Sequence, residues 1–401
     1  MSSTTKSPPS STSTLGACLI SFCILAGAYG LHGLGWTGGM IPILQSILND
    51  PAGNFPNSDT ALIRSYTGIT PIDTLLMNLV PFFGPVVDRT SLPLTIFSFF
   101  MFGQFGVGWS LMLLESFRGA NNGLALSFIT IFGILVQTTG FALTSPIWFL
   151  LYITTSPLAR SPATTQSMSS LRVPLSKLTV FPLVLSIGYI VPSAFIMLPS
   201  PSIVSMETRQ KLIAAWQPFP IYTTILMYIF SSLHSSSSTT SSSSISKAYT
   251  IASNILYTFL IIFAVITNVL ALLVTILPTN IISIVSPAIA SALKGSPIPV
   301  SFSTVYVPSP PLPSWKAVNL ADAVHTFLHV DTYVSGSAAL VWALILRSRA
   351  RNGEKGTGID MVYIVKLLIW TVLAGPFGAI TNVMWERERL LVETEKVKGG
   401  I

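Results

Sequence analysis

The chain has 401 residues, of which 50% are hydrophobic and only 9% are charged. Its mean hydropathy is +0.68. Soluble globular domains carry about 25% charged residues, so this composition argues against a soluble protein and indicates one embedded in lipid. The formal net charge of +7 comes from Lys and Arg scattered over short connections, without a basic stripe. This distribution fits contact with anionic lipid head groups and predicts no nucleic-acid partner.

The two cysteines, Cys18 and Cys23, lie in the first apolar run. Their spacing places them on different faces of a helix, and two thiols are too few for a disulfide framework or a structural zinc site. The sequence also lacks the phosphate-loop, dinucleotide, zinc-protease and serine-hydrolase motifs. We therefore expect neither a metal nor a cofactor.

Taken in order, the chain alternates between polar connections and long apolar runs. Residues 1–13 are rich in Ser, Thr and Pro and are predicted to be a disordered tail. Leu15–Gly35 follows as the first predicted span, because no clean signal-peptide cleavage site closes it. Further spans are predicted at 71–87, 92–114, 123–154, 178–198, 216–233, 249–277, 328–346 and 361–383. The expected fold is an all-α, polytopic transmembrane helix bundle of about eight or nine spans.

The bundle is predicted to form one domain over residues 14–390, followed by a tail at 391–401. The run 123–154 is too long for one straight span and contains Pro146, so a kinked helix or a helix plus a re-entrant piece is expected there. Residues 234–247 are nearly all Ser and Thr and are predicted to be a flexible loop. Residues 295–314 carry many prolines and are predicted to be non-helical.

Carboxyl groups within or beside spans are the first functional candidates, because a charged group at the bilayer centre costs roughly 2.5–3.5 kcal/mol. Asp73 lies at the entry of the second span, where a helix N-terminal acid is the alternative interpretation. Glu115 closes the third span, and Arg118 three residues later could pair with it at an interface. Glu388, near the C-terminus, is expected to be an ordinary solvated charge.

The segment from Asp322 to Tyr333 concentrates polar groups at the start of an apolar span. On a helix, Asp322, His325, His329 and Tyr333 fall within about 80° of one another, and Asp331 points to the opposite side. Three interpretations remain open for this cluster. A metal site would use the two histidines and has no evident third ligand except Asp322. A buried polar network would have no catalytic role, and acid–base chemistry would use the carboxyl groups.

Several phrases together resemble a known family. They are Leu114-Glu-Ser-Phe-Arg118 followed by Asn121-Asn-Gly123, Gln137 with Pro146-Ile-Trp-Phe-Leu-Leu-Tyr152, Gly188-Tyr-Ile-Val-Pro192, Ala215-Trp-Gln-Pro-Phe-Pro220, Asp331-Thr-Tyr333 with Trp342, and Gly375-Pro-Phe-Gly-Ala379 with Trp385-Glu-Arg-Glu388. In this order, over about residues 70–390, they resemble the fungal membrane-bound terpene cyclases of the ascofuranone and macrophorin type. One departure is His329, where the family pattern leads us to expect Gln.

The resemblance implies cyclisation of a farnesyl chain, often attached to a phenolic or quinoid head group, without a cofactor. An acid would protonate a terminal epoxide or alkene, since a desolvated carboxyl has a raised pKa and can stay protonated at neutral pH. Asp331 is the first choice for this acid, with His329 or Tyr333 tuning it. Asp73 and Glu115 are alternatives for the acid, or one of them accepts the final proton. The candidates for substrate binding are Trp216, Tyr189, Tyr333, Trp342, Gln137, Asp322 and His325.

The expected partners are a lipophilic, prenylated small molecule and membrane lipid, and the expected location is the endoplasmic reticulum membrane. A proton-coupled transporter is the main alternative, because it would also place acids and histidines within helices. A non-catalytic membrane scaffold is a second alternative, and it predicts no sizeable pocket. Sequence alone leaves open the oligomeric state, the orientation in the membrane, the head group, the ring pattern and the choice between epoxide and alkene.

Overall fold

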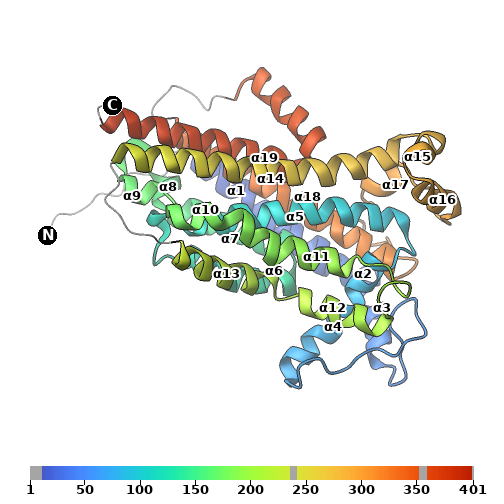
Figure 1. Cartoon of the computed structure of the whole chain (residues 1–401). Helices are drawn as coiled ribbons and strands as arrows, with labels where there is room; N and C mark the ends of the chain where they lie inside the picture. The colour runs from blue at the N-terminus through green and yellow to red at the C-terminus, as the bar shows by residue number, and fades with distance from the viewer. Residues whose placement is uncertain (1–10, 235–241, 352–358, 400–401) are drawn as a thin grey trace.

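In a computed structural model, residues 11–234, 242–351 and 359–399 are described, and they are helical with no β-strand beyond an isolated bridge between Asn54 and Ala61 (Figure 1). The α-helices are α1 Ser11–Gly27, α2 Leu34–Thr37, α3 Met40–Asn49, α4 Thr70–Asp88, α5 Leu92–Ser116, α6 Ile129–Thr139, α7 Phe141–Thr155, α8 Pro157–Arg160, α9 Met168–Leu171, α10 Leu175–Leu185, α11 Val191–Ile196, α12 Met206–Trp216, α13 Phe219–Leu233, α14 Ser242–Ile276, α15 Thr279–Val285, α16 Pro287–Gly295, α17 Phe302–Tyr306, α18 Leu320–Ala350 and α19 Met361–Gly399. Short π-helices, η1 Ala28–Gly33 and η5 Ser186–Ile190, continue α1 and α10, and 3₁₀ turns lie at η2 Gly119–Asn121, η3 Ala125–Ser127 and η4 Ala163–Thr165.

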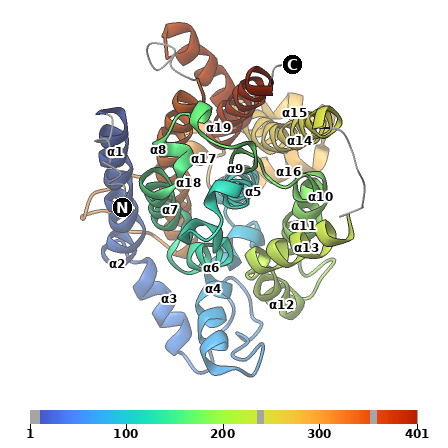
Figure 2. The same cartoon turned by 90° about the vertical axis from the view of Figure 1, so that its left-hand side faces the viewer.

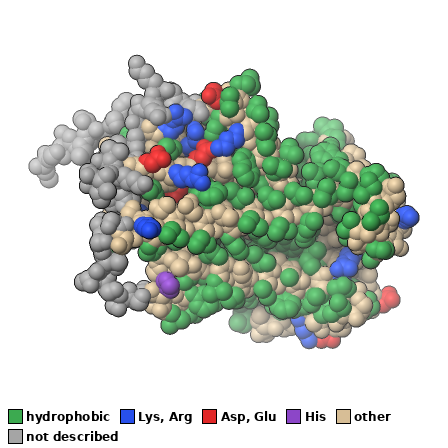
Figure 3. All heavy atoms as spheres, turned by 45° about the horizontal axis from the view of Figure 1, so that its top comes forward, with side chains coloured by type: hydrophobic (Ala, Val, Ile, Leu, Met, Phe, Trp, Pro, Cys, Tyr) green, Lys and Arg blue, Asp and Glu red, His purple; other side chains and the backbone are tan. Residues whose placement is uncertain are grey.

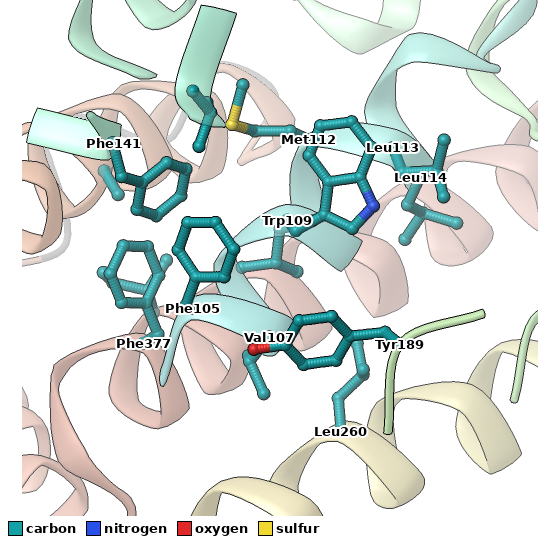
Figure 4. Packing of buried hydrophobic residues seen from close by; sticks show 14 of the residues in the cluster. Phe105, Val107, Trp109, Met112, Leu113, Leu114, Phe141, Tyr189, Leu260 and Phe377 are labelled. Carbon is teal, nitrogen blue, oxygen red and sulfur yellow. The ribbon is translucent and has the colours of Figure 1, made fainter. Parts of the chain in front are cut away.

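Helix α5 is the centre of the bundle. Helices α14, α18 and α19 pack directly against it, and α4, α6 and α10 complete its surroundings (Figure 2). Small residues on α5 permit this close approach: a Cβ added at Gly103 would meet the Thr267 hydroxyl of α14 at 1.8 Å. Around α5, the side chains of Phe105, Trp109 and Tyr189 form part of the buried hydrophobic core (Figure 4).

The outer faces of the bundle are apolar. On α14, Ile251, Ile255, Ile262, Ile266 and Leu270 follow one helix face and are each at least half exposed. Hydrophobic side chains cover the middle of the face in Figure 3, and charged side chains lie toward its two ends. This distribution fits a protein surrounded by lipid between two aqueous phases.

The prediction of an all-α polytopic bundle is confirmed, and the number of spans is at the low end of the expectation. Seven described helices are long and apolar enough to cross a membrane, and an eighth is counted if α12 and α13, bent by 58° at Pro218, form one broken span. The run 123–154 does not supply a spanning helix, because it divides into α6 and α7.

The division of this run falls at Gly140, not at Pro146, which lies inside α7. Gly140 has φ +92°, a backbone conformation that L side chains rarely adopt. The two helices contact each other, and the segment before α6 also meets α7: Trp148 Nε1 within α7 donates to the Leu126 carbonyl oxygen at 3.4 Å, and Ser156 Oγ after α7 donates to Asn121 Oδ1 at 2.6 Å. The two helices therefore form a hairpin whose tip is Gly140. With 11 residues, α6 extends only about 16 Å, roughly half a hydrocarbon core.

Four other regions differ from the expectation, one of them the predicted Ser/Thr loop 234–247, because α14 already begins at Ser242. The proline-rich segment 295–314 contains helix α17, which forms in its proline-free stretch between Pro299 and Pro308. Helix α1 begins within the predicted tail and α19 continues through most of the predicted C-terminal tail. Residues 1–10 of the predicted N-terminal tail and 235–241 of the predicted Ser/Thr loop lie outside the described residues.

Helix α19 is kinked at Gly375, where φ is +72° and Pro376 follows. The kink leaves backbone N–H and carbonyl groups inside the bundle without helical hydrogen bonds, and the side chain of Gln104 on α5 bonds to them instead. Its Nε2 donates to the Ala374 carbonyl oxygen at 3.0 Å, and its Oε1 accepts the Phe377 N–H at 2.9 Å. Broken helices persist at membrane depth only with such replacement hydrogen bonds. Gln104 therefore fixes the position of the α19 kink against α5.

Candidate active site

Asp331 lines a cavity of about 230 Å³ formed by η1, α3, α4, α5, α12, α18 and the tip of the α6–α7 hairpin. Its side chain is buried, with 4% of the residue exposed. Among the described residues lining this cavity, Asp331 is the only carboxylic acid and His32 is the only histidine. The remaining lining is largely apolar and aromatic. We call this space the acid cavity.

The N-terminus of α7 is directed at the Asp331 carboxyl group. The backbone N–H of Ala142 donates to Asp331 Oδ1 at 2.7 Å, and a Cβ on Gly140 would lie 3.1 Å from the same oxygen. The turn at Gly140 thus places the positive end of a helix dipole beside the carboxyl group. Amide groups in this position stabilise the negative charge that develops when the acid gives up its proton.

Aromatic rings form a continuous series along the acid cavity. Phe327 packs edge-on against Phe82, with ring centroids 5.0 Å apart, and Phe82 packs in the same way against Phe83. Phe83 contacts Trp216 at 5.1 Å, and Trp216 contacts Phe102 at 5.6 Å. All five line the cavity. Aromatic faces attract cations by about 2 kcal/mol or more each when water is excluded, so this wall suits a migrating positive charge.

His32, in the π-helix η1, is a member of the acid cavity that sequence analysis missed. Its Nε2 lies 3.1 Å from the Thr139 carbonyl oxygen. Since a carbonyl oxygen only accepts, Nε2 must carry the hydrogen, which leaves Nδ1 as the nitrogen with the lone pair in the neutral form of the ring. A single histidine within a long apolar run was the available signal, because such a polar group is rarely placed in a span without a use.

The structure separates the other predicted acids from this cavity. The Asp73 carboxylate holds the preceding loop, accepting from Ser65 Oγ at 2.7 Å and from the backbone N–H groups of Tyr66, Thr67 and Gly68 at 2.8–3.0 Å. Asp322 accepts the Val318 N–H at the start of α18. Neither residue lines the acid cavity.

Glu115 belongs to a buried ionic cluster elsewhere in the bundle. It pairs with Arg118 at 2.7 Å and with Arg387 at 2.6 Å, and Tyr152 donates to it at 2.5 Å. Arg118 also pairs with Glu388, which is 3% exposed. The expectation that Glu388 is solvated is therefore wrong, because the fold buries it against an arginine. Glu115 lies ten residues beyond Phe105 on α5, about 15 Å along the helix axis.

The two imidazoles of α18 lie on the face away from Asp331, as the helical period predicts. His325 and His329 stack 4.2 Å apart, and both Nε2 atoms contact the Val305 carbonyl oxygen, at 3.1 and 2.8 Å. Tyr333 donates to the Tyr306 carbonyl oxygen at 2.7 Å. The described residues form no group of three or more His, Cys, Asp or Glu that could hold a metal ion. This face anchors α17 to α18.

The aromatic and amide candidates divide between the cavity and the core. Trp216 and Gln137 line the acid cavity, and the Trp216 indole is fixed by a 2.9 Å hydrogen bond to Ser193 Oγ. Tyr189 instead packs in the core, where its hydroxyl donates to the Phe102 carbonyl oxygen at 2.7 Å (Figure 4). Trp342 stacks on Phe149, with centroids 4.8 Å apart, outside the cavity.

A helical membrane protein with one buried acid in an aromatic-lined cavity is suited to chemistry on an apolar substrate. The chain belongs to the CtvD domain family, which matches residues 15–392. It is 26% identical to the terpene cyclase AscI of Acremonium egyptiacum, over 96% of this chain and 94% of that protein. It is 23% identical to the terpene cyclase CtvD of Aspergillus terreus, over 94% and 99%, and 25% identical to the terpene cyclase AtmA of Aspergillus flavus, over 82% and 85%. No solved structure matches the chain.

Proposed function

We propose that this protein is a membrane-embedded terpene cyclase that protonates the terminal epoxide or alkene of a farnesyl chain and closes rings through carbocations. The observation that carries the proposal is the buried Asp331 carboxyl group, set against the α7 N-terminus in a cavity walled by aromatic rings. The curated relatives named terpene cyclases, with near full-length coverage, support the same reaction class.

Asp331 is the proposed proton donor. Burial among hydrocarbon side chains disfavours a bare carboxylate, so the resting acid carries a proton and delivers it to the substrate's terminal group. The Ala142 amide then stabilises the carboxylate that remains. As the chain closes, the cation passes along the ring series from Phe327 to Trp216. These rings attract positive charge but do not form a bond to the cation, as a nucleophile would.

His32 is the proposed proton acceptor at the end of the reaction. Cyclisation terminates when the last cation loses a proton, and the free Nδ1 lone pair of a neutral imidazole is a suitable base. Donation from Nε2 to the Thr139 carbonyl oxygen keeps the ring in this tautomer. In this scheme, protonation and deprotonation use different residues of one cavity.

The proposed substrate is a farnesyl chain attached to a phenolic or quinoid head group, and the proposed location is the endoplasmic reticulum membrane. The apolar helices support a membrane setting, and such a substrate partitions into lipid. The test is to express the protein in a yeast that lacks cyclases and to feed farnesylated phenols with and without a terminal epoxide. A cyclic product from either substrate, identified by mass spectrometry and NMR, is expected. Recovery of both substrates unchanged, with the protein folded in the membrane, would refute the proposal.

A further inference from the structure

A second cavity, of about 560 Å³, lies beside the acid cavity, between α4, α6 and the corner where α12 meets α13. Leu79, Gln137 and Thr138 line both cavities, so no more than one layer of side chains separates them. The α12–α13 corner also contributes to the lining of both cavities, because Trp216 lines the acid cavity and the next residue, Gln217, lines the second one. The two cavities are therefore direct neighbours, divided by the side chains that they share.

Polar side chains without partners line the second cavity. Gln217 is only 5% exposed, and neither its Nε2 nor its Oε1 has a hydrogen-bond partner. The buried hydroxyl of Tyr66 also lacks a partner, and Tyr66 lines the same cavity. An unsatisfied buried polar group costs about 1–3 kcal/mol, so a fold that retains three such atoms at one cavity points to a ligand that satisfies them.

The loop that carries Tyr66 is held in place by Asp73. Two hydroxyl groups and three backbone N–H groups of residues 65–68 donate to this one carboxylate. Burial and the nearby Asp73 charge raise the pKa of Tyr66, so its side chain stays a neutral phenol that can donate a hydrogen bond. This gives Asp73 a positioning role at the second cavity.

The charge of the lining indicates the chemistry of the ligand. Lys211 is the one cationic side chain among the described lining residues, and its ammonium group pairs with Glu207 at 2.6 Å. A diphosphate would require several cations, whereas an amide and a phenol suit an uncharged group with a hydroxyl or carbonyl oxygen. Three apolar lining residues, Ile72, Leu75 and Ile134, are each about 40% exposed, so the cavity borders the exposed apolar surface of the bundle.

We propose that the second cavity binds the uncharged phenolic head group of the substrate, with Gln217 and Tyr66 as its hydrogen-bond partners. The prenyl chain then runs past Gln137 into the acid cavity, and its far end reaches Asp331. This inference rests on the proposed function for the identity of the prenyl chain, and it adds the site that recognises the head-group end of the substrate. Substrate would enter from lipid with the prenyl tip first.

The test measures binding without turnover, in the Asp331→Asn background reconstituted into lipid nanodiscs. Scintillation proximity with a tritiated farnesylated phenol gives its Kd, and competition gives the Kd of farnesene, which has no head group, and of farnesyl diphosphate. Gln217→Met and Tyr66→Phe should each weaken phenol binding about tenfold, the loss of one buried hydrogen bond. Farnesene binding should stay within about twofold, and the diphosphate should bind no better than farnesene.

Tyr222→Phe is the matched control, because Tyr222 lines the same cavity but its hydroxyl group already donates to the Ala215 carbonyl oxygen. This change should alter phenol binding by less than about twofold. Unchanged phenol affinity in both Gln217→Met and Tyr66→Phe would overturn the inference, as would an equal loss of farnesene binding. If the wild type never cyclises a substrate, only the proposed function fails, since these affinities are measured independently of turnover.

Discussion

Replacing Asp331 with Asn tests the proposed proton donor most directly. Asn keeps the size of the side chain, and its carbonyl oxygen can still accept the Ala142 N–H that Asp331 accepts at 2.7 Å. The fold should therefore be retained, while the transferable proton is lost. No second carboxylic acid is present among the described residues of the acid cavity, so no other carboxyl group there can substitute for it.

The expected magnitude follows from the role of the group. General acid catalysis contributes about 10²–10⁴-fold to a rate, and here the proton starts the reaction. We expect the variant to lose at least about 10³-fold in kcat, equivalent to roughly 4 kcal/mol of transition-state stabilisation. Substrate affinity should change little, because most of the cavity wall is apolar and remains intact.

The assay quantifies cyclised product per folded enzyme by liquid chromatography and mass spectrometry, in reconstituted membranes. Asp322→Asn is the matched control: it lies on the same helix, but its carboxylate accepts the Val318 N–H away from the acid cavity. This control should stay within about threefold of wild type. A rate for Asp331→Asn within tenfold of wild type, or an equal loss in the control, would refute the assignment.

Three further substitutions test the surroundings of the acid. Gly140→Ala places a Cβ at φ +92° and 2.4 Å from a Leu31 methyl group. It should lower the free energy of unfolding by about 1–3 kcal/mol and reduce kcat, because the α7 N-terminus shifts. Thermal unfolding and turnover measure the two effects, and wild-type values for both would contradict this. Glu115→Gln should destabilise the protein by about 3–5 kcal/mol, because it leaves buried arginines without their full set of ion pairs. Turnover per folded molecule should stay near normal. A loss of turnover without a loss of stability would instead make Glu115 catalytic. His32→Gln should preserve ring closure but change the ratio of alkene isomers and water-quenched products in gas chromatography, and an unchanged product ratio would exclude it as the terminal base.

Sequence alone established the membrane class and the location of most spans, since hydrophobic length is a local property. It also placed Asp331 opposite His325 and His329, because the helical period decides which residues share a face. The resemblance to terpene cyclases was carried by ordered phrases spread along the chain, and the CtvD family match confirms it. The sequence also predicts a break in the run 123–154, but it points to Pro146, the more familiar helix breaker, whereas the chain breaks at Gly140.

Tertiary structure decided which polar groups meet. Asp331 takes its hydrogen bond from Ala142, 189 residues away in the chain, and only the turn at Gly140 brings that amide into reach. Asp73, Glu115 and Asp331 are all acids within spans, yet their surroundings differ. Asp73 holds a loop, Glu115 joins an ionic cluster and Asp331 lines a cavity. Periodicity reports the face on which a side chain lies, whereas its partners depend on long-range packing. The chemistry of each acid therefore follows from the fold, not from its place in the sequence.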